Sequence, residues 1–417
     1  MSLKSSHSKR LSFVTDELPR PGAAGHLAYN HALIAHLAAR GHAVTLYLTR
    51  PRLPCPILRK PDFAPGGTVA GPRLIQAGGW LIAAEPRAAA ASMARMVLPG
   101  STLHLLRSRA RRKTRAADVV LGNLIDTADA AWIAAHIASA LPDTKPPDAI
   151  LIDTIFRAPL LDQPLLAGIP SVLVTHDVFH RRHAALSLAG YRIAPPALSR
   201  EDEAALLRRA ATIVAIQPDE ARLLRELCPD RTVIAVPMPA PAAPRPAAVR
   251  RNPDRLVFVG SDALPNLDGL RWFFGAIWPG LRGARPAIRL DLVGDCAAAL
   301  GRLPAGVRRL GRLADLAPAL HNAALAIAPL RTGSGLKVKL LDYARHGLWT
   351  VATHAARTGL AEDVRPPVFV ADSPSSFGAT ILAALAQQPD DSDAIAYIGR
   401  HYAADHVFAS LTDLLET

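Results

Sequence analysis

Residues 328–352 read APLRTGSGLKVKLLDYARHGLWTVA and carry the clearest structural signal in the chain. The pattern predicts a strand that ends at Pro329, a loop with small residues at 333–335, a helix over about 336–346 and a second strand from Trp349. Small residues before a helix let backbone N–H groups approach an anion closely, and the helix dipole adds about half a positive charge there. The stretch therefore predicts a strand–loop–helix–strand unit with an anion-binding loop.

Two charged side chains in this stretch fit a nucleotide ligand. Lys337 falls in the first turn of the predicted helix, where it adds a full positive charge to the anion site. Asp342 falls near the middle of the helix and is a candidate to accept hydrogen bonds from a ribose diol. Glycine-rich turns before helices are also common structural devices, and Asp342 could be an ordinary solvated helix residue. The flanking strands favour the functional interpretation.

Outside this stretch, short apolar runs alternate with helical patterns, which predicts parallel α/β layers. In the first half, predicted strands cover residues 11–15, 43–48, 149–153, 171–175, 212–216 and 232–236. In the second half, they cover residues 255–259, 289–293, 325–328, 349–352 and 368–370. The Pro/Ala-rich segment 237–247 lies between the two series and is typical of a linker.

The length of 417 residues predicts more than one domain. We expect an N-terminal, acceptor-side domain over residues 1–240 and a C-terminal, nucleotide-binding domain over residues 241–402. The last helix, at about 403–417, is a candidate to pack back on the first domain. Two α/β halves joined by one linker place a cleft between them, and ligands of open parallel sheets bind beyond the carboxyl ends of the strands. The loops after the strands are therefore the expected place for the chemistry.

The formal net charge of +13 is compatible with nucleic acid, an anionic membrane or a phosphate-bearing substrate. No nucleic-acid-binding motif accompanies it, so we expect no nucleic-acid partner. Cys55, Cys228 and Cys296 are widely spaced and predict reduced thiols in a cytoplasmic protein. The first residues do not form a signal peptide, and no stretch approaches the roughly 20 apolar residues of a membrane span.

A basic run, residues 107–115, contains six Lys and Arg residues and follows several leucines. Such a run is usually a solvated face. The alternative is a surface for anionic lipid head groups or a lipid-diphosphate acceptor, since interfacial segments combine apolar and basic residues. The second interpretation predicts peripheral association with the inner face of the cell membrane, and both interpretations remain open from the sequence.

The stretch 328–352 resembles the donor-binding signature of the retaining glycosyltransferases of family 4, also called group 1. That signature is close to a Gly-x-Gly-x-Lys-x-Lys-x-Leu-Glu form. The matching positions in this sequence are Gly333, Gly335, Lys337, Lys339 and Leu341. Asp342 stands where the family usually has Glu, and Ser334 stands where relatives carry another Glu eight residues earlier.

Other segments follow in the order of that family. The FVGS segment at 258–261, with Asn266 shortly after it, resembles the entry to the nucleotide-binding domain, although this loop lacks the Arg that many relatives carry. The VTHD segment at 174–177 resembles the loop that faces the donor sugar. Gly25 fits the glycine-containing loop after the first strand. The match is specific in the C-terminal half and weak between about residues 51 and 147.

The resemblance implies a GT-B fold, with two Rossmann-like domains facing across a cleft. It implies transfer of a hexose, with retention, from a nucleotide diphosphate sugar to a glycan or lipid-linked acceptor, without a cofactor or a metal ion. Lys339, two residues after Lys337, is expected to point elsewhere and to matter less. The implied catalytic residues are His176, Asp177 and Ser334, and the implied substrate-binding residues are Gly25, Gly260, Ser261, Asn266, Gly333, Gly335, Leu336, Lys337 and Asp342.

The same residues leave other functions open. A sugar-nucleotide epimerase or a phosphorylase can use the same architecture. A non-catalytic sugar-nucleotide-binding partner is suggested by Ser334 in place of Glu. A dinucleotide oxidoreductase fits least, because no predicted strand is followed by a GxGxxG turn with an acidic residue about 20 positions on.

Overall fold

The computed structural model describes residues 8–20, 25–50, 53, 55–60, 68–97, 119–139, 146–188, 190–195, 197–332 and 336–416. The chain forms two compact units, which we call the N-terminal and C-terminal units. The N-terminal unit comprises residues 1–237 together with 408–417, and the C-terminal unit comprises residues 238–407. Each unit is built around its own parallel sheet.

The N-terminal unit contains a seven-stranded parallel sheet in the order β12-β11-β9-β8-β1-β2-β4. Its strands are β1 (Arg10–Thr15), β2 (Ala43–Leu48), β4 (Val69–Ala70), β8 (Ala149–Asp153), β9 (Ser171–Thr175), β11 (Thr212–Ala215) and β12 (Thr232–Ala235). The central strands are continuous apolar runs that are buried along their length, as expected for a parallel sheet covered on both faces. The chain first adds strands on one side of β1 and then on the other, so β1 and β8 flank a switch point.

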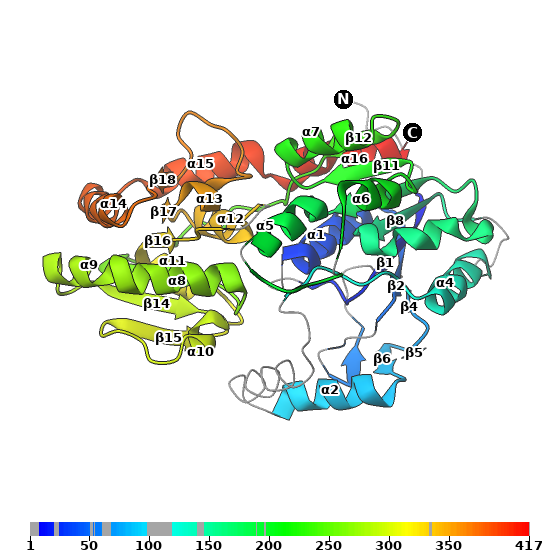
Figure 1. The fold of residues 1–417 in the computed structure, drawn as a ribbon, viewed down its shortest axis with the longest axis horizontal. Coiled ribbons are helices and arrows are strands. Elements are labelled where there is room, and N and C mark those ends of the chain that lie inside the picture. Colours follow the sequence, from blue (N-terminus) through cyan, green and yellow to red (C-terminus); the bar gives the residue numbers. More distant parts are fainter. Residues whose placement is uncertain are drawn as a thin grey trace. The chain divides into compact units, whose positions relative to one another are not determined.

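Helices and short 3-10 turns connect these strands (Figure 1). They are α1 (Gly25–Ala39), α4 (Thr127–Ser139), η1 (Ile155–Asp162), η2 (Pro164–Leu166), α5 (Phe179–Leu188), α6 (Arg200–Leu207) and α7 (Pro218–Leu227). The last helix, α16 (Ala404–Glu416), lies beside α1. His36 and Thr412 are 3.2 Å apart, and Arg40 pairs with Glu416 at 2.8 Å. These contacts place the end of the chain on the first helix.

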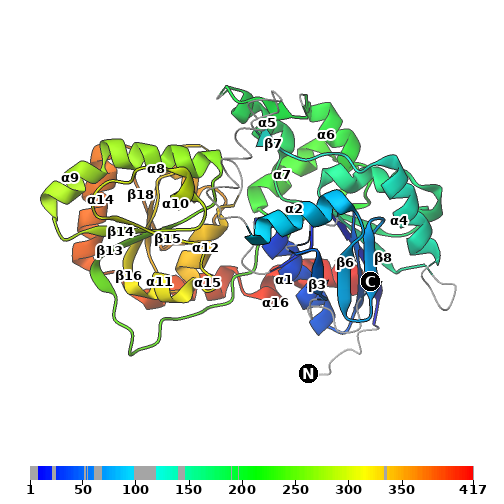
Figure 2. The same ribbon diagram turned by 90° about the horizontal axis from the view of Figure 1, so that it is seen from below.

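A smaller antiparallel sheet lies between β2 and α4, in the part of the chain where the sequence resembled nothing specific. It has the order β3-β6-β5 and is followed by a helix (Figure 2). The elements are β3 (Ile57–Arg59), β5 (Leu74–Ala77), β6 (Trp80–Ala83) and α2 (Pro86–Val97). A two-stranded parallel pair, β7 (Val119–Val120) with β10 (Ile193–Ala194), completes the unit. Strands this short carry too little periodicity to be read from sequence.

The C-terminal unit contains a six-stranded parallel sheet in the order β15-β14-β13-β16-β17-β18. The strands are β13 (Asn252–Val259), β14 (Arg289–Val293), β15 (Val307–Gly311), β16 (Ala323–Ala328), β17 (Thr350–Ala352) and β18 (Val368–Val370). This is the strand order of a dinucleotide-binding sheet, whose switch point lies between β13 and β16. The five strands predicted in this half are confirmed, and β15 was missed.

Helices cover both faces of this second sheet, with α8 on one side and α11 and α15 on the other (Figure 2). The helices are α8 (Leu264–Ala276), α9 (Trp278–Ala284), α10 (Cys296–Ala299), α11 (Ala317–Asn322), α12 (Val338–Arg345), α13 (His354–Arg357), α14 (Pro374–Gln387) and α15 (Asp391–His401). The aromatic side chains of Phe273 and Phe377 are fully buried in its core.

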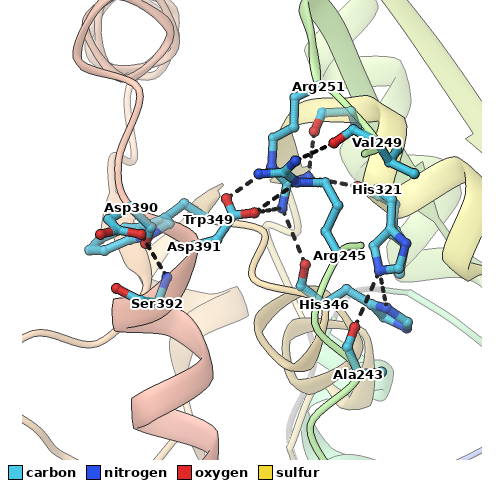
Figure 3. A network of polar contacts seen from close by, with 12 residues as sticks. Ala243, Arg245, Val249, Arg251, His321, His346, Trp349, Asp390, Asp391 and Ser392 are labelled. Atoms are coloured by element: carbon cyan, nitrogen blue, oxygen red, sulfur yellow. Dashed lines mark hydrogen bonds and ion pairs between the residues drawn. The ribbon is translucent and has the colours of Figure 1, made fainter. Parts of the chain in front are cut away.

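A polar network fastens the linker to the C-terminal unit (Figure 3). Arg251 donates to both carboxylate oxygens of Asp391 at 3.0 Å, and Arg245 donates to the same carboxylate at 2.9 Å. Arg251 also donates to the carbonyls of Leu320 and His346, which lie at the ends of α11 and α12. An Arg in this position satisfies helix carbonyls that have no intrahelical partner.

Asp391 is the first residue of α15 but does not cap the helix. The N-cap of α15 is Asp390, one residue earlier, and its side chain accepts a hydrogen bond from the backbone N–H of Ser392. The carboxylate of Asp391 is free to pair with the two Arg side chains because Asp390 already caps the helix. The sequence could not show that Asp391 pairs with these Arg side chains, because Arg245 and Arg251 are about 140 residues away from it in the chain.

Candidate functional site

The first group of candidate residues lies at the switch point of the C-terminal unit. Gly260 follows β13, and its N–H donates to Val293 at the end of β14. A Cβ at Gly260 would lie 2.6 Å from the Phe258 ring, and a Cβ at Gly294 would lie 2.3 Å from the Gly260 carbonyl oxygen. Only residues without a side chain allow the two loops to approach this closely. The backbone beyond β13 is therefore packed tightly and fixed in place.

Asn266, on the first turns of α8, connects this loop to α12. Its amide nitrogen donates to the Ser261 carbonyl at 3.1 Å, and its amide oxygen accepts from the ammonium of Lys339 at 2.6 Å. The Lys339 nitrogen also lies 4.1 Å from the centre of the Phe258 ring. Burial lowers the pKa of Lys339 to about 7, and the nearby positive charge of Lys337 adds to this effect. The cluster holds a cation at the switch point.

The expectation from the sequence was that Lys339 points elsewhere on its helix than Lys337. It rested on the angle of about 100° per residue between helix positions, which separates Lys337 from Lys339 only if both are helical. Lys337 has φ −88° and ψ 88° and is the N-cap of α12, so it precedes the helix instead of lying in its first turn. Its carbonyl accepts the first hydrogen bond of the helix, from Leu340, at 2.8 Å.

Asp342 lies on α12, as predicted, with a third of its side chain exposed. Burial of its carboxyl raises its pKa to about 6, although Arg345 acts in the opposite direction at 3.9 Å. Leu336 is buried beside the sheet. Three predicted residues of the glycine-rich loop lie outside the described residues, namely Gly333, Ser334 and Gly335.

The second group lies at the switch point of the N-terminal unit, where β1, β8 and β9 end side by side. Nε2 of His176, just after β9, is 2.8 Å from Oδ1 of Asp153, the last residue of β8. Thr15, the last residue of β1, donates from its hydroxyl to the other oxygen of Asp153 at 2.6 Å. Asp153 is 2% exposed, and the side chain of His176 is 10% exposed.

This geometry fixes the tautomer of the neutral imidazole. Burial raises the pKa of Asp153, but its hydrogen bonds and charge interactions with His176, His26 and Thr15 outweigh burial and hold the pKa below its ordinary value. An ionised Asp153 accepts the Nε2 proton of His176, which in the neutral imidazole leaves Nδ1 as an acceptor. Nδ1 is buried and has no hydrogen-bond partner among the described residues. A buried acceptor without a partner is costly, and a substrate hydroxyl would satisfy it.

Two further side chains enclose the imidazole. The ring of His26 lies 5.9 Å from that of His176, and burial lowers the pKa of His26. Tyr29 meets the His176 ring edge-on at 5.3 Å and donates its hydroxyl proton to the carbonyl of Val236. These contacts leave the ring of His176 little freedom to rotate.

Asp177 and Gly25, also predicted for the site, have other surroundings. Asp177 is 3% exposed, and its carboxylate accepts a hydrogen bond from Arg182 on α5 at 2.9 Å. Its backbone carbonyl accepts one from Thr175 at 2.7 Å. Gly25 is the exposed first residue of α1. Asp177 thus holds the turn after β9, and Asp153 is the carboxylate that contacts His176.

The two groups are suited to different chemistry. In the C-terminal unit, Lys337, Lys339 and the N-terminus of α12 supply positive charge for an anion. In the N-terminal unit, the Asp153–His176 pair presents a hydrogen-bond acceptor to a hydroxyl. No group of three or more His, Cys, Asp or Glu side chains in the described part of the chain is arranged to hold a metal ion.

Residues 253–387 match the model of a family described as Glycosyl transferases group 1. No curated protein matches the chain.

Solved structures cover more of the molecule. HepE from Anabaena, in complex with UDP and glucose, matches with a TM-score of 0.61 and 13% identity over 99% of this chain and 100% of HepE. A glycosyltransferase from Rickettsia africae matches with a TM-score of 0.52 and 9% identity over 98% of each chain. TarM from S. aureus matches with a TM-score of 0.50 and 10% identity, and the match covers 64% of this chain and 55% of TarM. The chain thus spans about half the length of TarM.

These likenesses confirm the predicted fold class and the predicted resemblance: the chain has the GT-B fold, and its C-terminal unit matches the group 1 glycosyltransferases.

Proposed function

We propose that the protein is a glycosyltransferase that moves a hexose from a nucleotide diphosphate sugar to a glycan or lipid-linked acceptor, with retention of configuration. The observation that carries the proposal is the cation cluster at the switch point of the C-terminal unit. Lys339 is held by Asn266 at 2.6 Å, within the segment that matches the group 1 family model. A buried cation beside a helix N-terminus suits the diphosphate of such a donor.

Each candidate residue then has a role. Lys337, Lys339 and the backbone N–H groups at the start of α12 stabilise the negative charge that develops on the leaving diphosphate. Asp342 accepts hydrogen bonds from the ribose hydroxyls. His176 accepts a hydrogen bond at Nδ1 from a hydroxyl of the reacting sugar and fixes its orientation, because Asp153 and Tyr29 hold the imidazole. Polysaccharide or glycolipid synthesis is the process in which such a transfer belongs.

A thermal-shift panel of UDP-, GDP- and ADP-sugars tests the proposal first. A ligand that binds only the folded protein raises its apparent stability, by about 2.7 kcal/mol at a concentration of 100 Kd. UDP-glucose is the first donor to include, because HepE was solved with UDP and glucose. We expect one class of nucleotide sugar to raise the melting temperature. If no member of the panel does so at millimolar concentration, the donor assignment is wrong.

Transfer is expected to survive chelation of metal ions. Positive charge from Lys337, Lys339 and the α12 N-terminus takes the place of a divalent cation at the diphosphate. Initial rates of donor cleavage are measured in buffer with 5 mM EDTA and in buffer with added magnesium or manganese, and we expect rates within about twofold, a difference worth less than 0.5 kcal/mol in barrier height. Loss of activity with EDTA and recovery with either metal would contradict this account of the donor site.

No helix in the described part of the chain is long and apolar enough to span a bilayer. The basic run at 107–115, which lies outside the described residues, is proposed to hold the protein to an anionic membrane surface. Each Lys or Arg near such a surface contributes about 1 kcal/mol, and the attraction is screened by salt. We expect co-sedimentation with anionic vesicles at low salt, release at high salt, and loss of binding when Arg111, Arg112 and Lys113 are replaced by Glu.

The matched control reverses three exposed Arg residues elsewhere, Arg222, Arg271 and Arg302. These changes alter the net charge equally but leave the run intact, so binding should persist. Equal binding to neutral vesicles would refute the membrane proposal and favour a soluble acceptor.

A further inference from the structure

A fully buried glutamate lies beside the loop that carries His176 in the N-terminal unit. Glu203, on α6, is 0% exposed and is not among the predicted site residues. Its Oε1 accepts a hydrogen bond from the backbone N–H of Phe179 at 2.9 Å. Its Oε2 accepts two more at 2.7 Å each, from the backbone N–H and from Nδ1 of His180. Three donors thus converge on one buried carboxylate.

These hydrogen bonds cap α5 from a neighbouring helix. Phe179 and His180 are the first two residues of α5, and the first N–H groups of a helix have no partner within it. Val178, which precedes the helix, has no side-chain acceptor with which to cap it. The carboxylate of Glu203 supplies the acceptors, and its negative charge suits the positive end of the helix dipole. The start of α5 is therefore fixed by α6, beside which it lies (Figure 1).

The position of Glu203 is an unfavourable one for a charged side chain. Burial raises the pKa of its carboxyl, and the hydrogen bonds from His180 and Phe179 oppose this rise. Replacing a buried ion pair by apolar residues of similar volume is often neutral for the stability of a protein, or stabilising. The buried carboxylate is therefore better explained by the chain that it orients than by a gain in stability.

The capped end of α5 is close to His176 along the chain. A loop of three residues that begins with His176 connects β9, which ends at Thr175, to α5, which begins at Phe179. The β9 end of this loop is held by the hydroxyl of Thr175, which donates to the carbonyl of Asp177 at 2.7 Å. The α5 end is held by Glu203. So short a connection passes any displacement of the α5 N-terminus on to His176.

We propose that Glu203 is a positioning residue for His176. It holds the N-terminus of α5 and, through the three-residue loop, keeps the imidazole where Nε2 meets the carboxylate of Asp153. Asp153 and Tyr29 orient the ring itself, whereas Glu203 fixes the backbone that carries it. The effect on catalysis rests on the proposed function of His176, and the positioning rests on the contacts of Glu203.

Two substitutions remove the cap in different ways. Glu203→Gln keeps the size of the side chain but places an NH₂ group among the donors, so at least one backbone N–H loses its acceptor. Glu203→Met keeps a similar volume without a polar group, and it is the second variant in case Glu203→Gln does not fold. We expect kcat for donor cleavage to fall by about 10- to 100-fold, because a misplacement of about 1 Å can cost about 100-fold. The Kd of the donor, measured by calorimetry, should not change, because the cation cluster lies in the C-terminal unit.

A second readout, NMR of the imidazole rings, does not depend on activity. In the full chain with ¹⁵N-labelled histidine, two-bond proton–nitrogen correlations distinguish the two tautomers, and His176→Gln assigns the signals of His176. At alkaline pH, where an imidazole is neutral, the wild type should show His176 as the Nε2–H tautomer. Either Glu203 variant should shift these signals or divide them between the tautomers. The signals of His401, which pairs with Asp363 in the C-terminal unit, should not change.

Asp291→Asn is the matched control. Asp291 is a buried carboxylate of the C-terminal unit that pairs with Arg255 and Arg308, so its loss should reduce stability without lowering kcat. An unchanged kcat or unchanged His176 signals in the Glu203 variant that folds, or an equal fall of kcat in Asp291→Asn, would overturn the proposal. If the wild type cleaves no nucleotide sugar, the proposed function fails, and the His176 signals still decide whether Glu203 positions His176.

Discussion

Replacing His176 by Ala is expected to lower the rate of sugar transfer by about 100- to 10,000-fold, the range for loss of a positioned proton-transfer or hydrogen-bonding group. The imidazole is oriented by Asp153 at 2.8 Å and by Tyr29, so its free Nδ1 meets the substrate in one geometry. The affinity for the nucleotide sugar should change little, because the cation cluster that holds the diphosphate is in the C-terminal unit. Steady-state kinetics and calorimetric donor binding measure the two quantities separately.

The chain offers a matched control for this substitution. His401 pairs with Asp363 at 2.7 Å, a distance similar to that between His176 and Asp153, at a place with no assigned chemistry. His401→Ala removes an equivalent His–Asp pair and should leave turnover within about twofold, which is under 0.5 kcal/mol. If His176→Ala and His401→Ala reduce activity equally, the effect of His176 is structural, and the assignment of the N-terminal site is wrong.

Replacing Lys339 by Met is expected to weaken nucleotide-sugar binding by about 10- to 150-fold. This corresponds to about 1.5–3 kcal/mol, the usual range for a hydrogen bond to a charged group. Methionine keeps the packing on Phe258 and removes the charge. Lys337→Ala should have an effect in the same range. The sequence favoured Lys337 alone, and the contact of Lys339 with Asn266 gives Lys339 equal weight. Isothermal titration calorimetry measures both variants.

The pH dependence of donor affinity distinguishes a contact between Lys339 and the phosphate from a role of Lys339 in packing. The pKa of Lys339 is lowered to about 7 by burial, so the ammonium form is lost in the free protein as the pH rises through 7. A bound diphosphate favours the charged form and raises this pKa. Donor affinity should therefore fall between pH 7 and 9, and Lys339→Met should remove this fall. A wild-type pH profile in Lys339→Met would contradict the role, and Lys9→Met, in the other unit, is the control.

The sequence was sufficient for the fold where apolar runs are long. The runs at 149–153 and 255–259 are buried central strands because both faces of a parallel sheet are covered. β15, residues Val307–Gly311, was missed because it is an edge strand that contains Arg308 and Arg309. Arg308 can face solvent there and pairs with Asp291 on the neighbouring strand. An edge strand pairs with one neighbouring strand and is partly exposed, so it contains fewer apolar residues and its hydrophobic pattern is weak.

The site was predicted where it follows a local motif. Asn266, Lys337 and Asp342 were named as candidates because the C-terminal half of the chain resembles a known signature. Asp153 was missed, although it is the carboxylate that contacts His176, because the pairing depends on β8 and β9 ending at the same edge of the sheet. One feature of the sequence did point to Asp153: it is an acidic residue at the end of an apolar strand, β8. The neighbouring strand β1 ends in Thr15, which is also polar. The VTHD segment at 174–177 instead suggested Asp177 as the catalytic carboxylate, and the structure pairs Asp177 with Arg182.

The most direct test of the central claim is donor cleavage with water as the acceptor, followed by proton NMR on the anomeric signals. Wild-type protein is mixed with the α-configured nucleotide sugar that gives the largest thermal shift, in EDTA. The account predicts slow release of nucleoside diphosphate and appearance of the free α-anomer before the β-anomer. Cleavage at low donor concentration should be slower in both His176→Ala and Lys339→Met. Appearance of an isomeric sugar nucleotide, release of the β-anomer first, or donor binding without any cleavage would contradict it.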